Sequence, residues 1–437
     1  MYDSNKLTYG KIFRFWYPLA ATWLMMSVEG PLLSAIIARL PMPKYNLAAY
    51  GVAFAFALII EAPVIMMLSA STALVSDRRS YHKLLRFVHL ISLIITAAMF
   101  VLLIPQVFFY ITENWMNLPV PVAEITHKAV LALIPWPAAI GYRRFYQGIL
   151  IRYNLTRRVA YGTAIRLSFM ALTAFTLYHF HVLPGAVVGG VALSTGVLME
   201  LVASRLMVHS TLKRIKTAGN KKDSEILSFG YISHFYLPLA LTSFLGLAVQ
   251  PMVTFMIGHS RMAIESLAVL PVINALIFVF RSVGLSFQEV AIALAGERYE
   301  NVPQLRGFAT LLGAVVTIIL GLIAFTPLSD FWYIQISGLK PQLAAFAELP
   351  TQILILMPAL SVLLSFQRAM SVNIRKTEWV TVASGIEMLL ILIVLYPAII
   401  GLEMVGVLAA AIALMIGRTG AVTYLAFKIA KPRGGHA

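Results

Sequence analysis

The chain has 437 residues, of which 60% are hydrophobic and only 12% are charged, so it is far more apolar than a typical soluble domain. The absence of cysteine excludes a disulfide framework, thiolate metal sites and a cysteine nucleophile. The net charge of +16 would suit a nucleic-acid partner, but the placement of the charges described below argues against one.

Twelve apolar stretches are each long enough to cross a bilayer, which takes about 20 helical residues. In chain order they fall at residues 14–38, 47–74, 86–111, 126–148, 159–180 and 185–208, then at 231–257, 266–293, 307–333, 348–371, 379–400 and 403–427. Residues 1–14 are polar and no cleavage site follows them, so we expect no removable signal peptide. The sequence predicts an all-α polytopic membrane protein with twelve transmembrane helices.

The second half of the chain repeats the first. At a constant offset of 220 the matching pairs are Pro18 and Pro238, Pro31 and Pro251, and Arg78 and Arg298. Further along the offset grows to 223, where the matching pairs are Pro135 and Pro358, and Arg152 and Arg375. Each half holds an even number of spans, so both enter the membrane the same way up, as a parallel repeat of two six-helix lobes.

The longest polar run lies between the two halves. We therefore predict an N-terminal lobe at residues 1–216, a cytoplasmic linker at 217–228 and a C-terminal lobe at 229–437. Two such lobes are typical of a secondary transporter that opens alternately to the two sides of the membrane.

The lysines and arginines gather in one set of loops, those after the second, fourth, sixth and tenth spans and the C-terminal segment. Because cytoplasmic loops are enriched in these residues, we expect both termini in the cytoplasm. The excess positive charge then marks topology and contacts anionic lipid headgroups, and no nucleic-acid partner is expected.

Several charged residues fall inside the predicted spans, where each costs about 2.5 to 3.5 kcal/mol near the bilayer centre. The candidate substrate- or ion-binding residues are Glu29, Glu61, Arg166, Glu200, Arg281, Glu289, Glu387 and Arg418. Such residues are expected to face a wet cavity or a partner. The offset of 220 places Arg281 opposite Glu61, which predicts a cavity to which the two lobes contribute opposite charge.

Glu29 stands next to Gly30 and Pro31, where a bent first helix would place a carboxylate beside free backbone carbonyls. Pro31 and its repeat partner Pro251 are the predicted helix bends. Glu29 is a candidate site for a coupling proton or sodium ion, and a buried ion pair with an arginine is the structural alternative. We expect no other cofactor and no metal site.

Two interpretations of the intramembrane arginines stay open. A guanidinium suits carboxylate and phosphate groups, so Arg166, Arg281 and Arg418 would recognise an anionic substrate, or they would pair with Glu61, Glu200 or Glu387. The adjacent Arg143 and Arg144 would line a vestibule, but reaching toward the membrane interface is the favoured reading of this pair.

Enzyme signatures such as HExxH, a GK[ST] phosphate loop and GxSxG are missing, so no enzyme is expected. A membrane-embedded transferase would need clustered catalytic acids or histidines at one membrane face, and the sequence shows no such cluster. An interaction scaffold would have little reason to keep charged residues inside its spans, so this class is also not favoured. The energy source is then an ion gradient, the membrane potential, the substrate's own gradient or a partner protein.

The stretch 47–53, LAAYGVA, followed by Pro63 and by the motif Ser76-Asp77-Arg78, resembles the progressive ankylosis (ANKH) proteins of the MOP flippase superfamily. That superfamily includes the multidrug and toxin extrusion (MATE) exporters and the lipid-linked sugar flippases. Ser76-Asp77-Arg78 is also similar to a motif of the major facilitator superfamily, which is the runner-up fold.

The resemblance implies two six-helix lobes around a V-shaped cavity and export by alternating access. We expect a secondary exporter of a small organic or phosphorylated anion or amphiphile, with transport coupled to an ion. The alternatives are a lipid-linked precursor flippase and a cation-coupled MATE-type multidrug antiporter. The expected location is a bacterial-type inner membrane or a plasma membrane, with membrane lipids as partners and the chain as a monomer.

Overall fold

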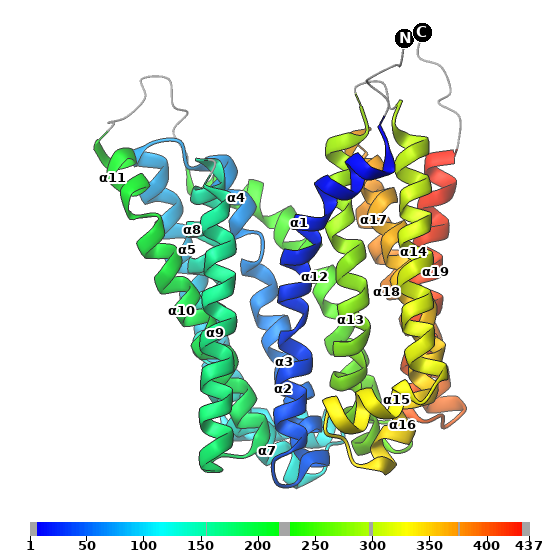
Figure 1. Ribbon diagram of the computed structural model, residues 1–437. Helices are drawn as coiled ribbons and strands as arrows, with labels where there is room; N and C mark the ends of the chain where they lie inside the picture. Colours follow the sequence, from blue (N-terminus) through cyan, green and yellow to red (C-terminus); the bar gives the residue numbers. More distant parts are fainter. Residues whose placement is uncertain (1–6, 154, 218–227, 297–299, 375, 431–437) are drawn as a thin grey trace. The chain divides into compact units, whose positions relative to one another are not determined.

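The computed structural model describes residues 7–153, 155–217, 228–296, 300–374 and 376–430 (Figure 1). These residues form helices and short connections, and no β-strand occurs among them. The structures similar to this one, reported below, confirm the predicted all-α polytopic membrane fold.

Ten helical segments among the described residues are long and apolar enough to cross a membrane. They are Tyr9–Ala38, Pro43–Leu74, Arg78–Leu102, Thr156–Phe180, Gly185–Met207, Ala263–Leu294, Val302–Phe325, Pro341–Asn373, Glu378–Gly401 and Gly406–Ala430. The other two predicted spans correspond to α8 (Pro135–Arg152), which carries three arginines, and α12 (Phe229–Ile257), whose apolar part is Ser243–Ile257. The number twelve stays a prediction.

One compact unit consists of Met1–Ala35 and His259–Ala437. Its helices are α1 (Tyr9–Ser27), α13 (Ala263–Leu294), α14 (Val302–Phe325), α15 (Leu328–Asp330), η3 (Phe331–Ile336), α16 (Pro341–Ile353), η4 (Leu354–Leu356), α17 (Met357–Asn373), α18 (Glu378–Tyr396), η5 (Pro397–Gly401) and α19 (Gly406–Ala430). α13 packs on α1 and α17, and α19 packs on α17 and α18. A core around Phe287 and Phe308 joins α13 to α14 and receives Ile12 of α1.

The other compact unit is Ile36–Gly258. Its helices are α3 (Pro43–Glu61), η1 (Ala62–Val64), α4 (Met67–Leu74), α5 (Arg78–Leu102), α6 (Pro105–Phe109), η2 (Tyr110–Trp115), α7 (Val120–Ala132), α8, α9 (Thr156–Phe180), α10 (Gly185–Met207), α11 (His209–Thr217) and α12. α10 packs on α3, α7, α8 and α9 and so lies at the centre of this unit. α2 (Glu29–Ala38) contains the division between the units at Ala35.

The compact units divide the chain at other positions than the predicted lobes. α1 packs with the second half of the chain, where Trp16 Nε1 donates a hydrogen bond of 2.8 Å to Ser286 Oγ on α13. α12 packs with the first half, where the Tyr236 hydroxyl donates to the Pro63 carbonyl oxygen and the Tyr236 ring contacts Phe87 edge-on. Residues 218–227 of the predicted linker lie outside the described residues.

The sequence repeat is visible in the backbone. Met42 and Met262, 220 positions apart, both take left-handed φ angles, of 53° and 55°, directly before α3 and α13. This backbone conformation is uncommon for residues other than glycine, asparagine or aspartate, so its recurrence at the repeat offset supports the duplication. η2 and η3 are both π-helical and start 221 positions apart.

In the later part of the repeat the structural offset is 221, not the predicted 223. Leu155 N bonds to Leu150 O, and Lys376 N bonds to Ser371 O in the same way. Arg152 then corresponds to Asn373 rather than Arg375, which lies outside the described residues. The side chains of Arg152 and Asn373 donate to carbonyl oxygens of residues that are 220 positions apart. Arg152 Nη1 donates to Thr72 O at 2.7 Å, and Asn373 Nδ2 donates to Ile292 O at 3.5 Å.

The Ser76-Asp77-Arg78 motif has a local structural role. Asp77 is the N-cap of α5: its side chain accepts from Ser80 N at 2.8 Å, and Ser80 Oγ accepts from Asp77 N at 2.9 Å. This reciprocal pair satisfies two of the free N–H groups at a helix start. The resemblance of this motif to a transporter signature is therefore also explained by helix capping.

The two predicted bends differ in the structure. Helix α1 ends at Ser27 and α2 begins at Glu29, so a break lies directly before Pro31, which falls in the first turn of α2. Proline is well tolerated there because the first-turn N–H groups have no intrahelical partner. Pro251 lies inside α12, which continues without interruption to Ile257.

Candidate functional site

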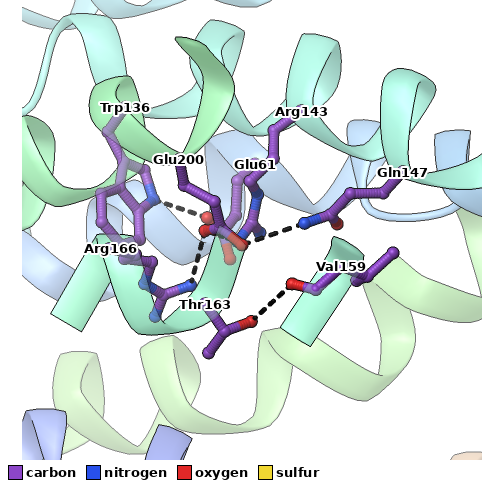
Figure 2. A network of polar contacts seen from close by, with 8 residues as sticks. All are labelled: Glu61, Trp136, Arg143, Gln147, Val159, Thr163, Arg166 and Glu200. Atoms are coloured by element: carbon purple, nitrogen blue, oxygen red, sulfur yellow. Dashed lines mark hydrogen bonds and ion pairs between the residues drawn. The ribbon is translucent and has the colours of Figure 1, made fainter. Parts of the chain in front are cut away.

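The first cluster of polar side chains, in unit Ile36–Gly258, surrounds Glu200 (Figure 2). Arg143 and Gln147 lie one turn apart on α8 and present the same face of the helix to Glu200 on α10. Arg143 Nη1 forms an ion pair with Glu200 Oε2, and Gln147 Nε2 donates to Oε1 at 2.9 Å. Arg166 Nη1, on α9, lies 3.8 Å from Oε2.

Glu61, the last residue of α3, completes the first cluster. It accepts a hydrogen bond of 2.5 Å from Trp136 Nε1 in the first turn of α8 (Figure 2). Its carboxylate interacts electrostatically with Arg143, Arg144 and Arg166. Two carboxylates thus face three guanidinium groups. Glu200 is 0% exposed and each of its oxygens has a donor, so the carboxylate of Glu200 is satisfied within this cluster.

The expectation that Arg143 reaches toward the membrane interface is wrong. Its residue exposure is 5%, and its partner is the buried carboxylate of Glu200. A charged group this deeply buried needs a counter-charge, which α10 supplies. Arg166 pairs with Glu200 in the structure, which is the second of the two interpretations given for the intramembrane arginines.

The second cluster lies in the other unit and consists of Arg281 on α13, Arg368 on α17, Glu387 on α18 and Arg418 on α19. Arg418 Nη2 forms an ion pair of 2.9 Å with Glu387 Oε1. Arg281 Nε donates to Ser361 Oγ at 3.1 Å, and Arg368 Nη2 donates to Ser384 Oγ at 3.3 Å. The four charged groups interact with one another electrostatically.

Among the described residues, Glu387 is the one carboxylate that pairs with an arginine of the second cluster. Three guanidinium groups therefore share a single negative charge. The side chains of Glu387 and Arg418 are 9% and 11% exposed, and Arg281 and Arg368 are also partly exposed. Three guanidinium groups around one carboxylate are an arrangement able to bind an anion.

At two positions of the repeat the clusters carry opposite charges. Glu61 matches Arg281 at the offset of 220, as predicted, and Arg166 matches Glu387 at 221. The second match rests on packing. A Cβ added to Gly196 would lie 3.0 Å from Arg166 O, and one added to Gly417, 221 positions later, would lie 2.8 Å from Glu387 O. The helix pairs α9–α10 and α18–α19 therefore cross at equivalent points.

The remaining predicted residues belong to neither cluster. Glu29 is the first residue of α2 and is nearly buried, in a region where the neighbouring Gly30 packs closely against Ala275 of α13. Glu289 lies in the last third of α13 with an exposed side chain. Their roles in transport stay predictions.

Three donors of these clusters, Trp136, Gln147 and Arg368, were not among the predicted site residues. Arg368 lies inside the predicted span 348–371 and carried the same signal as the intramembrane charges that were singled out. Gln147 corresponds to Arg368 at the offset of 221, a match that the offset of 223 concealed. Trp136 carries no pattern that distinguishes it from an ordinary apolar residue.

No model of a known protein family matches this chain, and neither does any curated protein. Solved structures do match. The lipid II flippase MurJ in an inward closed conformation has a TM-score of 0.74 at 18% identity, covering 94% of this chain and 87% of that one.

Two structures of multidrug resistance MATE family transporters of the MOP superfamily also match. The inward-facing conformation has a TM-score of 0.68 at 14% identity, with 93% of each chain covered. The outward-facing conformation has a TM-score of 0.63 at 16% identity, covering 95% of this chain and 94% of that one. The chain thus has the fold of the MOP-superfamily transporters and flippases rather than the runner-up major facilitator fold.

Proposed function

We propose that the chain is a secondary transporter that exports a small organic or phosphorylated anion, or an anionic amphiphile, by alternating access. The carrying observation is the second cluster, where three partly exposed arginines share one buried carboxylate. Cationic groups in helices long and apolar enough to span a membrane are costly unless an opposite charge compensates them. A bound anionic substrate supplies that charge.

Alternating access is supported by the fold. This chain is similar over nearly its full length to transporter structures described as inward-facing and as outward-facing. A fold that takes both conformations in other proteins suits a carrier whose binding site opens to each side in turn. The proposed repeats are the lobes 1–216 and 229–437, joined at 217–228.

Two alternative functions are favoured by particular observations. The similarity to a lipid II flippase favours a lipid-linked precursor as the substrate, because an arginine cluster also suits a pyrophosphate. The similarity to multidrug transporters favours a cation-coupled MATE-type antiporter. We also propose that, within the MOP superfamily, the chain is most similar to the progressive ankylosis proteins, on the basis of the stretch 47–53.

A ligand screen separates these functions. Purified chain is heated with organic and phosphorylated anions, with cationic dyes or with lipid pyrophosphates, and the midpoint of thermal unfolding is recorded. Small anions are expected to raise the midpoint, since a ligand that binds the folded state stabilises it. Stabilisation by dyes alone would favour the antiporter, and stabilisation by lipid pyrophosphates alone the flippase.

We propose Glu29 as the coupling site for a proton or sodium ion, because its carboxylate is nearly buried at the break between α1 and α2. Replacing Glu29 with glutamine removes the charge but keeps the size. We expect Glu29→Gln to lose the dependence of uptake into vesicles on an imposed proton or sodium gradient, while the amount of protein in the membrane is unchanged. Unaltered gradient dependence would remove Glu29 from the mechanism.

The proposed topology places both termini in the cytoplasm of a multi-pass inner or plasma membrane protein, which acts as a monomer. Reporter domains fused after Asn220 and after Gly434 are both expected to give a cytoplasmic signal, because the basic loops set the orientation. A reporter fused in the outer loop after Phe180 serves as the control and is expected to give the opposite signal. An external signal at either cytoplasmic site would contradict the topology.

A further inference from the structure

We infer that the second cluster selects a divalent anion, such as a dicarboxylate or a phosphate monoester. This inference rests on the proposed function and deepens it, since it assigns a charge to the substrate. Arg281, Arg368 and Arg418 contribute three positive charges and Glu387 one negative charge, which leaves a surplus of two. Arginine keeps its charge in proteins, so the surplus does not vanish by deprotonation.

The partners of the three arginines locate the surplus. Arg418 has a carboxylate partner, Glu387, at 2.9 Å. Arg281 and Arg368 donate to the hydroxyl groups of Ser361 and Ser384, which carry no charge. Two guanidinium groups are therefore hydrogen-bonded but not neutralised.

The second cluster also has donor atoms without a hydrogen-bond partner in the described part of the chain. The Nε atoms of Arg368 and Arg418 are buried and have no hydrogen-bond partner among the described residues, as is also true of Arg143 and Arg144 in the first cluster. Leaving a buried donor without a partner is costly, and guanidinium donors bind carboxylate and phosphate oxygens in paired geometry. An anion with several oxygens would use these donors and the charge at once.

The first cluster provides an internal comparison. There Arg143, Arg144 and Arg166 face two carboxylates, and Glu200 already accepts from two of its neighbours. Each cluster thus has three arginines, at different positions of the repeat, and the second cluster has one carboxylate fewer. Arg281 stands where the first cluster has Glu61, and Glu387 stands where it has Arg166, so these two exchanges cancel in charge. The larger surplus of the second cluster comes from its other residues, among them Arg368 in place of Gln147.

Charge neutrality then orders ligands of similar size. A monovalent anion would leave one positive charge uncompensated, and a trivalent anion would add one negative charge too many. In a site of low dielectric constant, each unbalanced charge is costly. The three probes are butyrate, glutarate and tricarballylate, which are small carboxylates with one, two and three carboxyl groups.

The experiment measures the dissociation constant of each probe for the full chain in lipid nanodiscs at neutral pH and constant ionic strength. Glutarate is expected to bind about tenfold more tightly than butyrate or tricarballylate, the factor that one charged hydrogen bond supplies. Glu387→Gln raises the surplus to three and is expected to move the preference to tricarballylate. Arg368→Gln lowers it to one and is expected to move the preference to butyrate.

Lys376→Gln is the matched control, because it removes a positive charge from an exposed ion pair with Glu378 outside the cluster. It is expected to leave the order of the three probes unchanged. The same order of probes in wild type, Glu387→Gln and Arg368→Gln would overturn the divalent assignment while leaving an anion transporter in place. Binding of no anion at all, with cationic dyes still bound, would overturn the proposed function itself.

Discussion

Replacing Glu200 with glutamine is expected to lower the free energy of unfolding by about 3–5 kcal/mol, the cost of removing one partner from a buried ion pair. Glu200 is 0% exposed and holds Arg143 and Arg166 in place across three helices. The substitution keeps the size of the side chain but removes the carboxylate at ion-pair distance from two guanidinium groups. Unfolding by increasing denaturing detergent, followed by circular dichroism, measures the change.

The control for this prediction is Glu378→Gln. Glu378 forms a solvent-exposed ion pair with Lys376, and exposed pairs contribute about 0–1 kcal/mol. Equal stability changes for Glu200→Gln and Glu378→Gln would mean that the first cluster does not hold its unit together.

Arg281→Ala is expected to weaken binding and transport of an anionic substrate by about tenfold or more, because a charge-assisted hydrogen bond is lost. Arg281 donates to Ser361 and has no carboxylate partner at ion-pair distance among the described residues. Its removal therefore leaves no buried carboxylate unpaired. Uptake of an anion and of a cationic dye into vesicles, compared between wild type and variant, measures the effect.

A second arginine separates substrate recognition from structural support. Arg152 donates to the Thr72 and Ala73 carbonyl oxygens outside both clusters, so Arg152→Ala is expected to lower stability without changing the preference for anions. Equal losses of anion and dye transport in Arg281→Ala would instead assign Arg281 a structural role.

The helices and the repeat could be predicted because both depend on patterns that the sequence carries directly. Apolar stretches of about 20 residues mark the spans. The offset of 220, read from recurring prolines and arginines, also relates Met42 to Met262 in the backbone. The opposition of Glu61 and Arg281 followed from the same offset.

The later offset was wrong because a proline was matched to the wrong partner. At 221, Pro358 corresponds to Pro137 rather than to Pro135, and both residues stand in the first turn of a helix. One helical residue turns a side chain by about 100°. An error of two residues therefore concealed the correspondences of Arg166 with Glu387 and of Gln147 with Arg368.

The contacts of the clusters could not be predicted, because they depend on how neighbouring helices are rotated about their axes. Arg143 and Arg144 are adjacent in sequence, yet Arg143 forms an ion pair with buried Glu200, and Arg144 is the more exposed of the two. α1 packs with the second half of the chain and α12 with the first half, and this arrangement likewise depends on side-chain contacts such as Trp16 with Ser286. Neither contact leaves a periodic trace in the sequence.

The most direct test of the account is flux through the purified protein in vesicles. Wild type and Arg281→Ala are reconstituted into vesicles at equal amounts, and the vesicles are loaded with labelled glutarate. The exchange of this label for external glutarate is followed over time. Wild-type vesicles are expected to exchange the label well above protein-free vesicles, with the variant slowed about tenfold. Exchange at the same rate in both proteins would contradict an anion site built on the second cluster.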